Sequence, residues 1–301
     1  MKKGNVFVGS RYEIHFEKSF LVVKDIQNSN YVKVRGELMQ LICRNISSHS
    51  LEEMLEKMFE SKTFLKDKKL VQLNFVGRRK FRSKIHKIPN LVCRLNTIVL
   101  LVIVGIIIGG LDIIYGEENG KCSCWIWFLW TVFNIIMHEF GHVLLCIHAG
   151  RTVPAIGLKL NYGIPMLYVD TTDICMCSLR AKIAVSLGGI YANTCLCIAI
   201  SIIDLFGKFG LMELSRISFF FIISNLIPFI KLDGYYVLSD CIGEANLNRA
   251  SKYAFKRLIK RKENNKKNIF LSVFFIVKSL FLLFVMHEII SSILVIMYSW
   301  L

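Results

Sequence analysis

Long apolar runs separated by short polar stretches dominate the chain after about residue 95. Four of these runs approach the roughly 20 residues that a helix needs to cross a bilayer, and they cover residues 96–114, 124–148, 180–204 and 213–230. A fifth apolar tract, 269–301, is long for one span and short for two, so we expect one span with a bent or re-entrant end. The pattern predicts a multi-span α-helical membrane protein.

The first 90 residues follow a different pattern, in which short β-like runs precede amphipathic helical runs. Alternating apolar and polar positions predict strands, and apolar positions three and four apart predict helices. The expected strands are 11–16, 19–24 and 31–34, the expected helices are 37–43 and 51–59, and a closing strand is expected at 70–76. This order predicts a small α+β, winged-helix-like cytosolic domain over residues 1–90, followed by a membrane domain over residues 91–301.

Composition and charge agree with a membrane protein. The chain is 54% hydrophobic with a mean hydropathy of +0.49, which is too apolar for an ordinary soluble protein. Positive charges gather at 80–94 and again at 249–267, and such segments remain on the cytosolic side. Four spans lie between these two segments, an even number, and no signal peptide is visible. We therefore expect the N-terminus in the cytosol.

The 10 cysteines do not resemble a secreted disulfide framework, because most lie in or beside apolar runs. Three Cys-x-Cys pairs occur, and we interpret them as small buried apolar side chains rather than metal or redox groups. Cys122 and Cys124 border a short polar loop at 116–121, so a chemical role stays open for that pair.

The second predicted span contains His138-Glu-Phe-Gly-His142. Two histidines four residues apart lie on one face of a helix, so both imidazoles can bind one metal ion. Glu139 lies between them and is placed to take a proton from water. Titratable groups are costly within a membrane, which favours a functional site over a chance occurrence of the pattern.

A catalytic zinc ion usually has three protein ligands, so a third is expected. His148 has the spacing of the third histidine ligand in one known class of zinc enzymes. On a continuous helix, however, it lies about 120° away from His142, so we reject His148 as the third ligand. Asp233 follows a later apolar run, with Pro228 before it and Gly234 after it. An Asp beside a membrane needs a partner such as a cation. Spacing alone is equally compatible with Asp233 capping a turn at the interface.

The two motifs together resemble the site-2 protease family of intramembrane zinc metallopeptidases. The resemblance rests on His138–His142 and on Asn225-x-x-Pro228-x4-Asp233-Gly234, and it implies a site-2-protease-like core with Asp233 as the third zinc ligand. The stretches 167–173, 180–189 and 233–240 are similar to the peptide zinc metalloprotease branch, which often accompanies peptide-modification and export systems in bacteria. Gly188-Gly189 departs from the Gly-Pro pair common in that family.

This resemblance implies a membrane zinc metalloendopeptidase of the bacterial cytoplasmic membrane, with Glu139 as catalytic base. It also offers Asn193 and Asn225 as substrate-binding residues, although polar contacts in helix packing account for both equally well. Asn134 is assigned to packing, and Asp170 and Asp173 to stabilising the loop after the second span.

Residues 31–59 resemble the leader-peptide recognition domain found with peptide-modifying enzymes. The expected substrate is therefore a ribosomally made precursor peptide, with the lipid bilayer and a peptide-modifying enzyme or exporter as further partners. A DNA-binding module is a competing interpretation of residues 1–90, and nucleic acid is not expected. Proteolysis of a membrane-anchored signalling protein is a second candidate function, against which stands the absence of a visible PDZ insertion. A non-catalytic immunity or transport scaffold is a third.

Overall fold

A computed structural model describes most of the chain, which divides into two compact units, residues 1–222 and 223–301. The described residues are 5–9, 11–16, 21–26, 30–34, 37–44, 50–60, 93–115, 123–153, 155–161, 164–207, 210–244, 246–260 and 265–299. Three predictions lie wholly or largely outside them: the closing strand at 70–76, the basic stretch at 80–94 and the polar loop at 116–121.

The N-terminal region forms an antiparallel four-stranded sheet followed by two helices. The strands are β1 (Asn5–Val8), β2 (Tyr12–Phe16), β3 (Leu21–Asp25) and β4 (Asn30–Val34), in that order across the sheet, and the helices are α1 (Glu37–Arg44) and α2 (Ser50–Glu60). The predicted strands and helices within the described residues are confirmed, and β1 is additional. The winged-helix arrangement stays a prediction, because its closing strand is outside the described residues.

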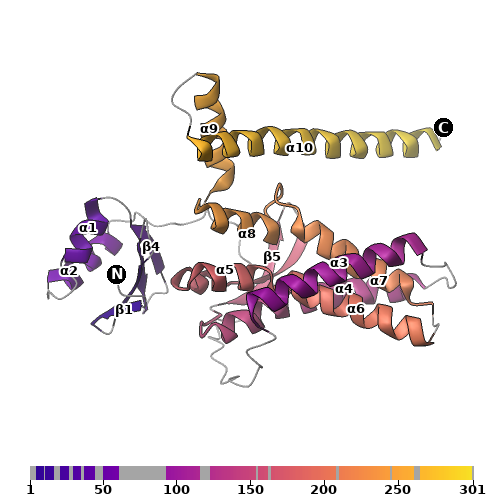
Figure 1. The fold of residues 1–301 in the computed structure, drawn as a ribbon, viewed down its shortest axis with the longest axis horizontal. Helices are drawn as coiled ribbons and strands as arrows, with labels where there is room; N and C mark the ends of the chain where they lie inside the picture. Colours follow the sequence, from indigo (N-terminus) through magenta and orange to yellow (C-terminus); the bar gives the residue numbers. More distant parts are fainter. Residues whose placement is uncertain are drawn as a thin grey trace. The chain divides into compact units, whose positions relative to one another are not determined.

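Helices α1 and α2 pack on one face of this sheet (Figure 1), because alternate strand positions and one stripe of each helix are apolar. The buried set includes Tyr12 and Ile14 of β2 and Leu51, Leu55 and Phe59 of α2. The rings of Tyr12 and Phe59 stack with centroids 5.6 Å apart. The opposite face of the sheet carries a row formed by Glu13, Lys24 and Tyr31.

The helical part of the first unit that follows the N-terminal region is built on α3 (Leu95–Tyr115), α4 (Cys124–His148), α6 (Gly188–Gly207) and α7 (Met212–Leu226). Helix α6 packs against both α3 and α4 (Figure 1). A buried polar cluster joins three of the helices, because the Asp112 carboxylate on α3 accepts hydrogen bonds of 2.6 Å from Ser201 on α6 and from Ser215 on α7. These donors compensate a charge that burial would otherwise make costly.

Two predicted spans are wrong in their bounds. The third is interrupted at Leu187, so that α5 (Leu179–Ser186) is separate and the span candidate begins at Gly188. The fourth is only 15 residues long as α7, roughly 22 Å at 1.5 Å per residue. It ends at Leu226 because Pro228 disfavours helix at the residue before it. Among the described residues, the helices long and apolar enough to cross a membrane are α3, α4, α6 and Lys266–Ser292 of α10. Three of these precede the basic segment at 249–267, and α7, the fourth predicted span, is shorter than the roughly 20 residues that a crossing helix needs.

Between α4 and α5 the chain forms a short β-structure. Strands β5 (Ile156–Asn161) and β6 (Ile164–Val169) pair antiparallel, and the 3-10 helix η1 (Thr172–Met176) follows. The Asp170 carboxylate accepts hydrogen bonds from the backbone and hydroxyl of Thr172 at 2.9 and 2.5 Å. Asp170 therefore stabilises this segment, as predicted.

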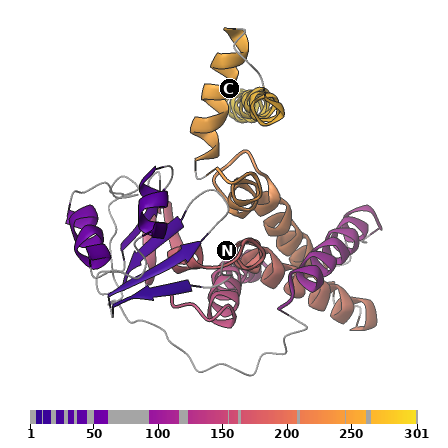
Figure 2. The same ribbon diagram turned by 60° about the vertical axis from the view of Figure 1, so that its left-hand side comes forward.

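The second unit contains the end of α7 followed by α8 (Asp233–Ile242), α9 (Leu247–Ile259) and α10 (Lys266–Ser299). Helix α10 is uninterrupted, so the predicted bend in the last apolar tract is wrong. Helix α9 crosses the first turns of α10 steeply (Figures 1 and 2), with Phe255 stacked on Phe275 and Lys278 donating to Asn248. The apolar side of α9 faces α10, and its basic residues remain exposed.

Candidate metal centre

The side chains of His138 and His142 meet on one face of α4, as their spacing predicts. Their Nε2 atoms are 3.3 Å apart and their rings are nearly perpendicular, with centroids separated by 5.0 Å. Both residues are largely buried, with 8% and 9% of their surface exposed. Two nitrogen ligands of a tetrahedral zinc ion lie about 3.4 Å apart, so this separation suits a shared ion.

The ring of His142 is held in one tautomer by the backbone of α5. Its Nδ1 atom is 2.8 Å from the carbonyl oxygen of Val185. A carbonyl oxygen only accepts, so Nδ1 carries the proton and the Nε2 lone pair points toward His138. Contacts of this kind orient metal-binding histidines in proteins.

Asn193 performs the equivalent task for His138 from α6. Its side-chain amide lies 3.2 Å from Nδ1 of His138, and the residue is fully buried. With the amide nitrogen toward the ring, the amide oxygen of Asn193 has no hydrogen-bond partner. The amide oxygen and nitrogen have nearly the same shape, and exchanging them lets the oxygen accept the Nδ1 proton. The Nε2 lone pairs of both histidines then face each other, an arrangement that a cation relieves.

Three glycines allow α4 and α6 to approach closely enough for this geometry. A Cβ atom on Gly141 would lie 2.1 Å from the carbonyl oxygen of Gly188, and one on Gly188 would lie 2.7 Å from that of Gly141. A Cβ atom on Gly189 would lie 2.4 Å from the ring of His138. Gly141, within His138–His142, and the Gly188-Gly189 pair are thus packing requirements of the site. In the sequence only Gly188-Gly189 stands out, as a departure from the Gly-Pro pair of the resembled family.

Asp233 is the first residue of α8, and its position follows from a close backbone contact. A Cβ atom on Gly234 would lie 2.3 Å from the carbonyl oxygen of Leu226, at the end of α7. Glycine at this position therefore lets the first turn of α8 fold against the last turn of α7.

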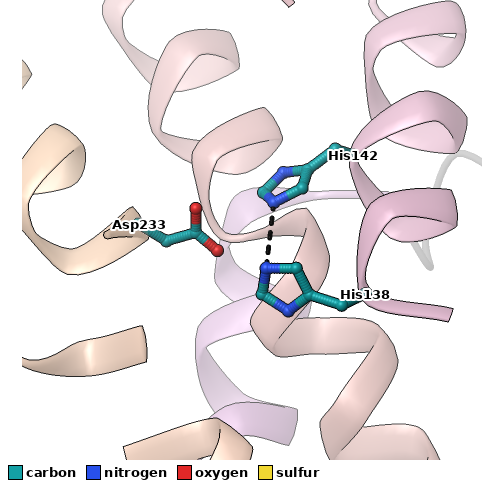
Figure 3. Close-up of side chains that lie close together, drawn as sticks. All are labelled: His138, His142 and Asp233. Carbon is teal, nitrogen blue, oxygen red and sulfur yellow. Dashed lines mark hydrogen bonds between the residues drawn. The ribbon is translucent and has the colours of Figure 1, made fainter. Parts of the chain in front are cut away.

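His138, His142 and Asp233 form a group whose ligand atoms all lie within 4.8 Å of one another (Figure 3). Two imidazoles and a carboxylate are a ligand set that zinc prefers at catalytic sites, which also keep one position open. His148, at the end of α4, is not part of this group. The described cysteines form no such group either, and none of them is in a disulfide.

The remaining predicted residues lie as follows. Glu139 is half-buried and directly follows His138 on α4. Asn134 is fully buried, and its amide donates to the carbonyl oxygen of Trp130 on its own helix at 3.0 Å, which agrees with a packing role. Asn225 lies in the last turn of α7, close to the contact made by Gly234.

Comparison with known proteins gives one informative similarity. The chain is 31% identical over 134 residues to the "Putative peptide zinc metalloprotease protein YydH" of Bacillus subtilis (strain 168). The match covers 40% of this chain and 52% of that protein, so the chain spans about half the length of this relative. No family model matches the chain, and no solved structure matches it. The name of the relative agrees with the chemistry that the His-His-Asp group suits.

Proposed function

We propose that the protein is a membrane zinc metallopeptidase that hydrolyses a peptide bond. The observation that carries the proposal is the group of His138, His142 and Asp233, two of whose members lie on an apolar helix long enough to cross a bilayer. The similarity to a protein named as a peptide zinc metalloprotease supports the same reaction class.

The chain's own residues divide the work of hydrolysis. A bound zinc ion supplies Lewis acidity, which makes water more acidic and polarises a peptide carbonyl. Val185 and Asn193 orient the two imidazoles through their Nδ1 atoms, which leaves Nε2 of His138 and of His142 available as the atoms that would hold a zinc ion. Glu139 accepts a proton from the attacking water and returns it to the leaving amine. The contact of Asn193 with His138 favours a role in orienting that ring over direct substrate binding, while Asn225 remains a candidate for substrate contact.

We further propose that the site works at the cytosolic side of a bacterial cytoplasmic membrane. Glu13 of the N-terminal sheet is ion-paired with Arg151, three residues after the end of α4. This contact supports a placement of the sheet and the end of α4 on one side of the membrane. Two candidate spans, α3 and α4, separate these residues in sequence, which agrees with that placement. The basic residues at 80–94 favour the cytosol for that side.

The proposed substrate is a ribosomally made precursor peptide held by the N-terminal domain, which resembles a leader-peptide recognition domain. The test is co-expression of the full chain with short peptides encoded beside its gene, followed by mass spectrometry of the peptides. We expect cleavage by the wild-type chain and by Glu244→Gln, a carboxylate outside the metal group that pairs with Lys267. Glu139→Gln should abolish cleavage without loss of bound zinc. Equal cleavage by Glu139→Gln would contradict the mechanism.

A further inference from the structure

A row of polar side chains crosses the face of the N-terminal sheet that α1 and α2 leave uncovered. In the strand register, Glu13 of β2 lies opposite Lys24 of β3, and Lys24 lies opposite Tyr31 of β4. Cross-strand neighbours point to the same face, so these three side chains form one line. Glu13 and Lys24 are nevertheless only 5% and 9% exposed. Charged side chains are buried to this extent only when they are paired.

Their partners come from the segment that leaves α4. Arg151 donates two hydrogen bonds to the carboxylate of Glu13, from Nη1 at 2.9 Å and from Nη2 at 3.0 Å. Lys24 donates to Asp173 at 2.6 Å, and the Tyr31 hydroxyl donates to the same carboxylate at 2.8 Å. We call Glu13, Lys24, Tyr31, Arg151 and Asp173 the docking cluster. Its two carboxylates and two cations balance in charge.

Asp173 is the centre of the docking cluster. Besides Lys24 and Tyr31, its two oxygens accept from Nε and Nη2 of Arg151 at 3.2 and 2.9 Å. The backbone and hydroxyl of Thr152 add hydrogen bonds of 3.0 and 2.9 Å. Burial alone would raise the pKa of Asp173, but the hydrogen bonds from Arg151, Lys24 and Thr152 outweigh it and hold that pKa well below its usual range.

The docking cluster lies next to the metal-bearing helix in the chain. Arg151 and Thr152 lie three and four residues after the end of α4, which carries His138 and His142. Asp173 lies in η1, immediately before α5, whose Val185 carbonyl orients His142. The N-terminal sheet therefore contacts the segment between α4 and α5 near both of its ends. Helix α4 carries His142, and α5 orients the ring of that residue.

From these contacts we propose that Arg151 and Asp173 are positioning residues, which hold the N-terminal sheet in a fixed orientation beside the metal-bearing helix so that a peptide bound by the N-terminal domain reaches the site in one register. This proposal rests on the proposed function for the peptide, but not for the docking itself. The two parallel hydrogen bonds from Arg151 to Glu13 and the several donors to the Asp173 carboxylate fix the orientation of the sheet as well as its distance. A purely apolar contact would tolerate sliding and rotation of the sheet.

The docking is tested on the full chain in membranes with a zero-length carbodiimide, which joins a carboxylate to an amine in contact. The measured product is the Lys24–Asp173 link, detected by mass spectrometry. The exposed Glu53–Lys57 pair on α2, at 2.8 Å, provides an internal control within the N-terminal domain. We expect both links in the wild-type chain and in Glu139→Gln.

Arg151→Met and, more mildly, Glu13→Gln should reduce the Lys24–Asp173 link several-fold while leaving the Glu53–Lys57 link unchanged. Arg180→Met is the matched control, because Arg180 is exposed at the start of α5; it should leave both links at the wild-type level. A wild-type chain that yields only the Glu53–Lys57 link would overturn the docking. An undiminished Lys24–Asp173 link in both cluster variants would overturn the assignment of Arg151 as a positioning residue.

The positioning role is tested by comparing two substrates. A full precursor should lose about tenfold or more in kcat/KM with Arg151→Met, because presentation at a high effective concentration is lost. A short peptide that contains only the cleaved segment should be processed by this variant as by the wild type. An equal loss on both substrates would show damage to the site itself and would overturn positioning. If the wild-type chain cleaves neither substrate, the proposed peptidase function fails, whereas the crosslinking result decides the docking independently.

Discussion

Arg151 binds Glu13 through a two-pronged ion pair that joins residues 138 positions apart in the chain, with N–O distances of 2.9 and 3.0 Å. Their side chains are only 13% and 7% exposed. Glu13 belongs to the N-terminal sheet, and Arg151 follows the helix that carries both metal-binding histidines. The ion pair thus connects the two regions that the sequence presents as separate domains.

This pair should be energetically coupled. Glu13→Gln leaves part of the Arg151 charge without its partner, and removing one member of a buried pair costs about 3–5 kcal/mol. Arg151→Met should cost at least as much, because Asp173 also loses donors. The double variant should be less destabilised than the sum of the two single variants, as judged from thermal unfolding of the purified chain. Strict additivity would contradict a direct contact between the two residues.

The docking cluster should withstand mild acid. The pKa of Asp173 in the folded chain lies below its unfolded value of about 3.9, with Lys24, Arg151, Tyr31 and Glu13 around it. Its carboxylate therefore contributes stability at pH values above about 4 and loses that contribution as the pH falls further. The difference in unfolding temperature between wild type and Asp173→Asn should be constant from pH 7 to 5 and shrink toward pH 3. A difference that vanishes already near pH 6 would contradict this account.

Gly189→Ala should weaken metal binding without unfolding the bundle. The added methyl group would lie 2.4 Å from the His138 ring, which must then rotate away from His142. We expect a loss of bound zinc in the purified chain by elemental analysis. Gly110→Ala on α3 is the matched control, because a Cβ atom there meets nothing within 4 Å. Full zinc content in Gly189→Ala would show that the ring is not held against α6.

The sequence predicts those features that local patterns determine. Apolar runs locate α3 and α4, alternation locates β2 to β4, and the four-residue spacing places His138 and His142 on one face. The end of α7 is less predictable, because the apolar pattern continues through residue 230 while Pro228 and the turn after Leu226 end the helix earlier. The number of apolar residues in 269–301 likewise does not show whether this tract is straight or bent. In the structure it forms one continuous helix, α10.

Features that depend on tertiary packing are outside the reach of the sequence. No local rule pairs Arg151 with Glu13, although charged residues on alternate strand positions do show that the second sheet face is not an apolar core. The roles of Gly141 and Gly189 depend on the distance between α4 and α6. The contact of Val185 with His142 uses a backbone carbonyl, which leaves no signature in the residue type.

Asn193→Ala should reduce zinc affinity by about 10- to 100-fold, the usual effect of removing a residue that orients a metal ligand. Its amide is the partner of His138 Nδ1 at 3.2 Å. Asn193→Asp should retain most of the affinity, since a carboxylate accepts the same proton. The measurement is competition with a chelator of known affinity. The Asn134→Ala variant is the control, because that amide bonds to its own helix; an equal loss in both variants would indicate general loosening of the bundle.

The zinc content of the purified full chain tests the central claim most directly. We predict about one zinc ion per chain in the wild type, in Glu139→Gln and in Asp240→Asn, a conservative change later on α8. His138→Ala, His142→Ala and Asp233→Ala should each lose the ion while the helices remain folded by circular dichroism. A wild-type chain without zinc, or an Asp233→Ala chain that keeps it with unchanged affinity, would contradict the His-His-Asp site.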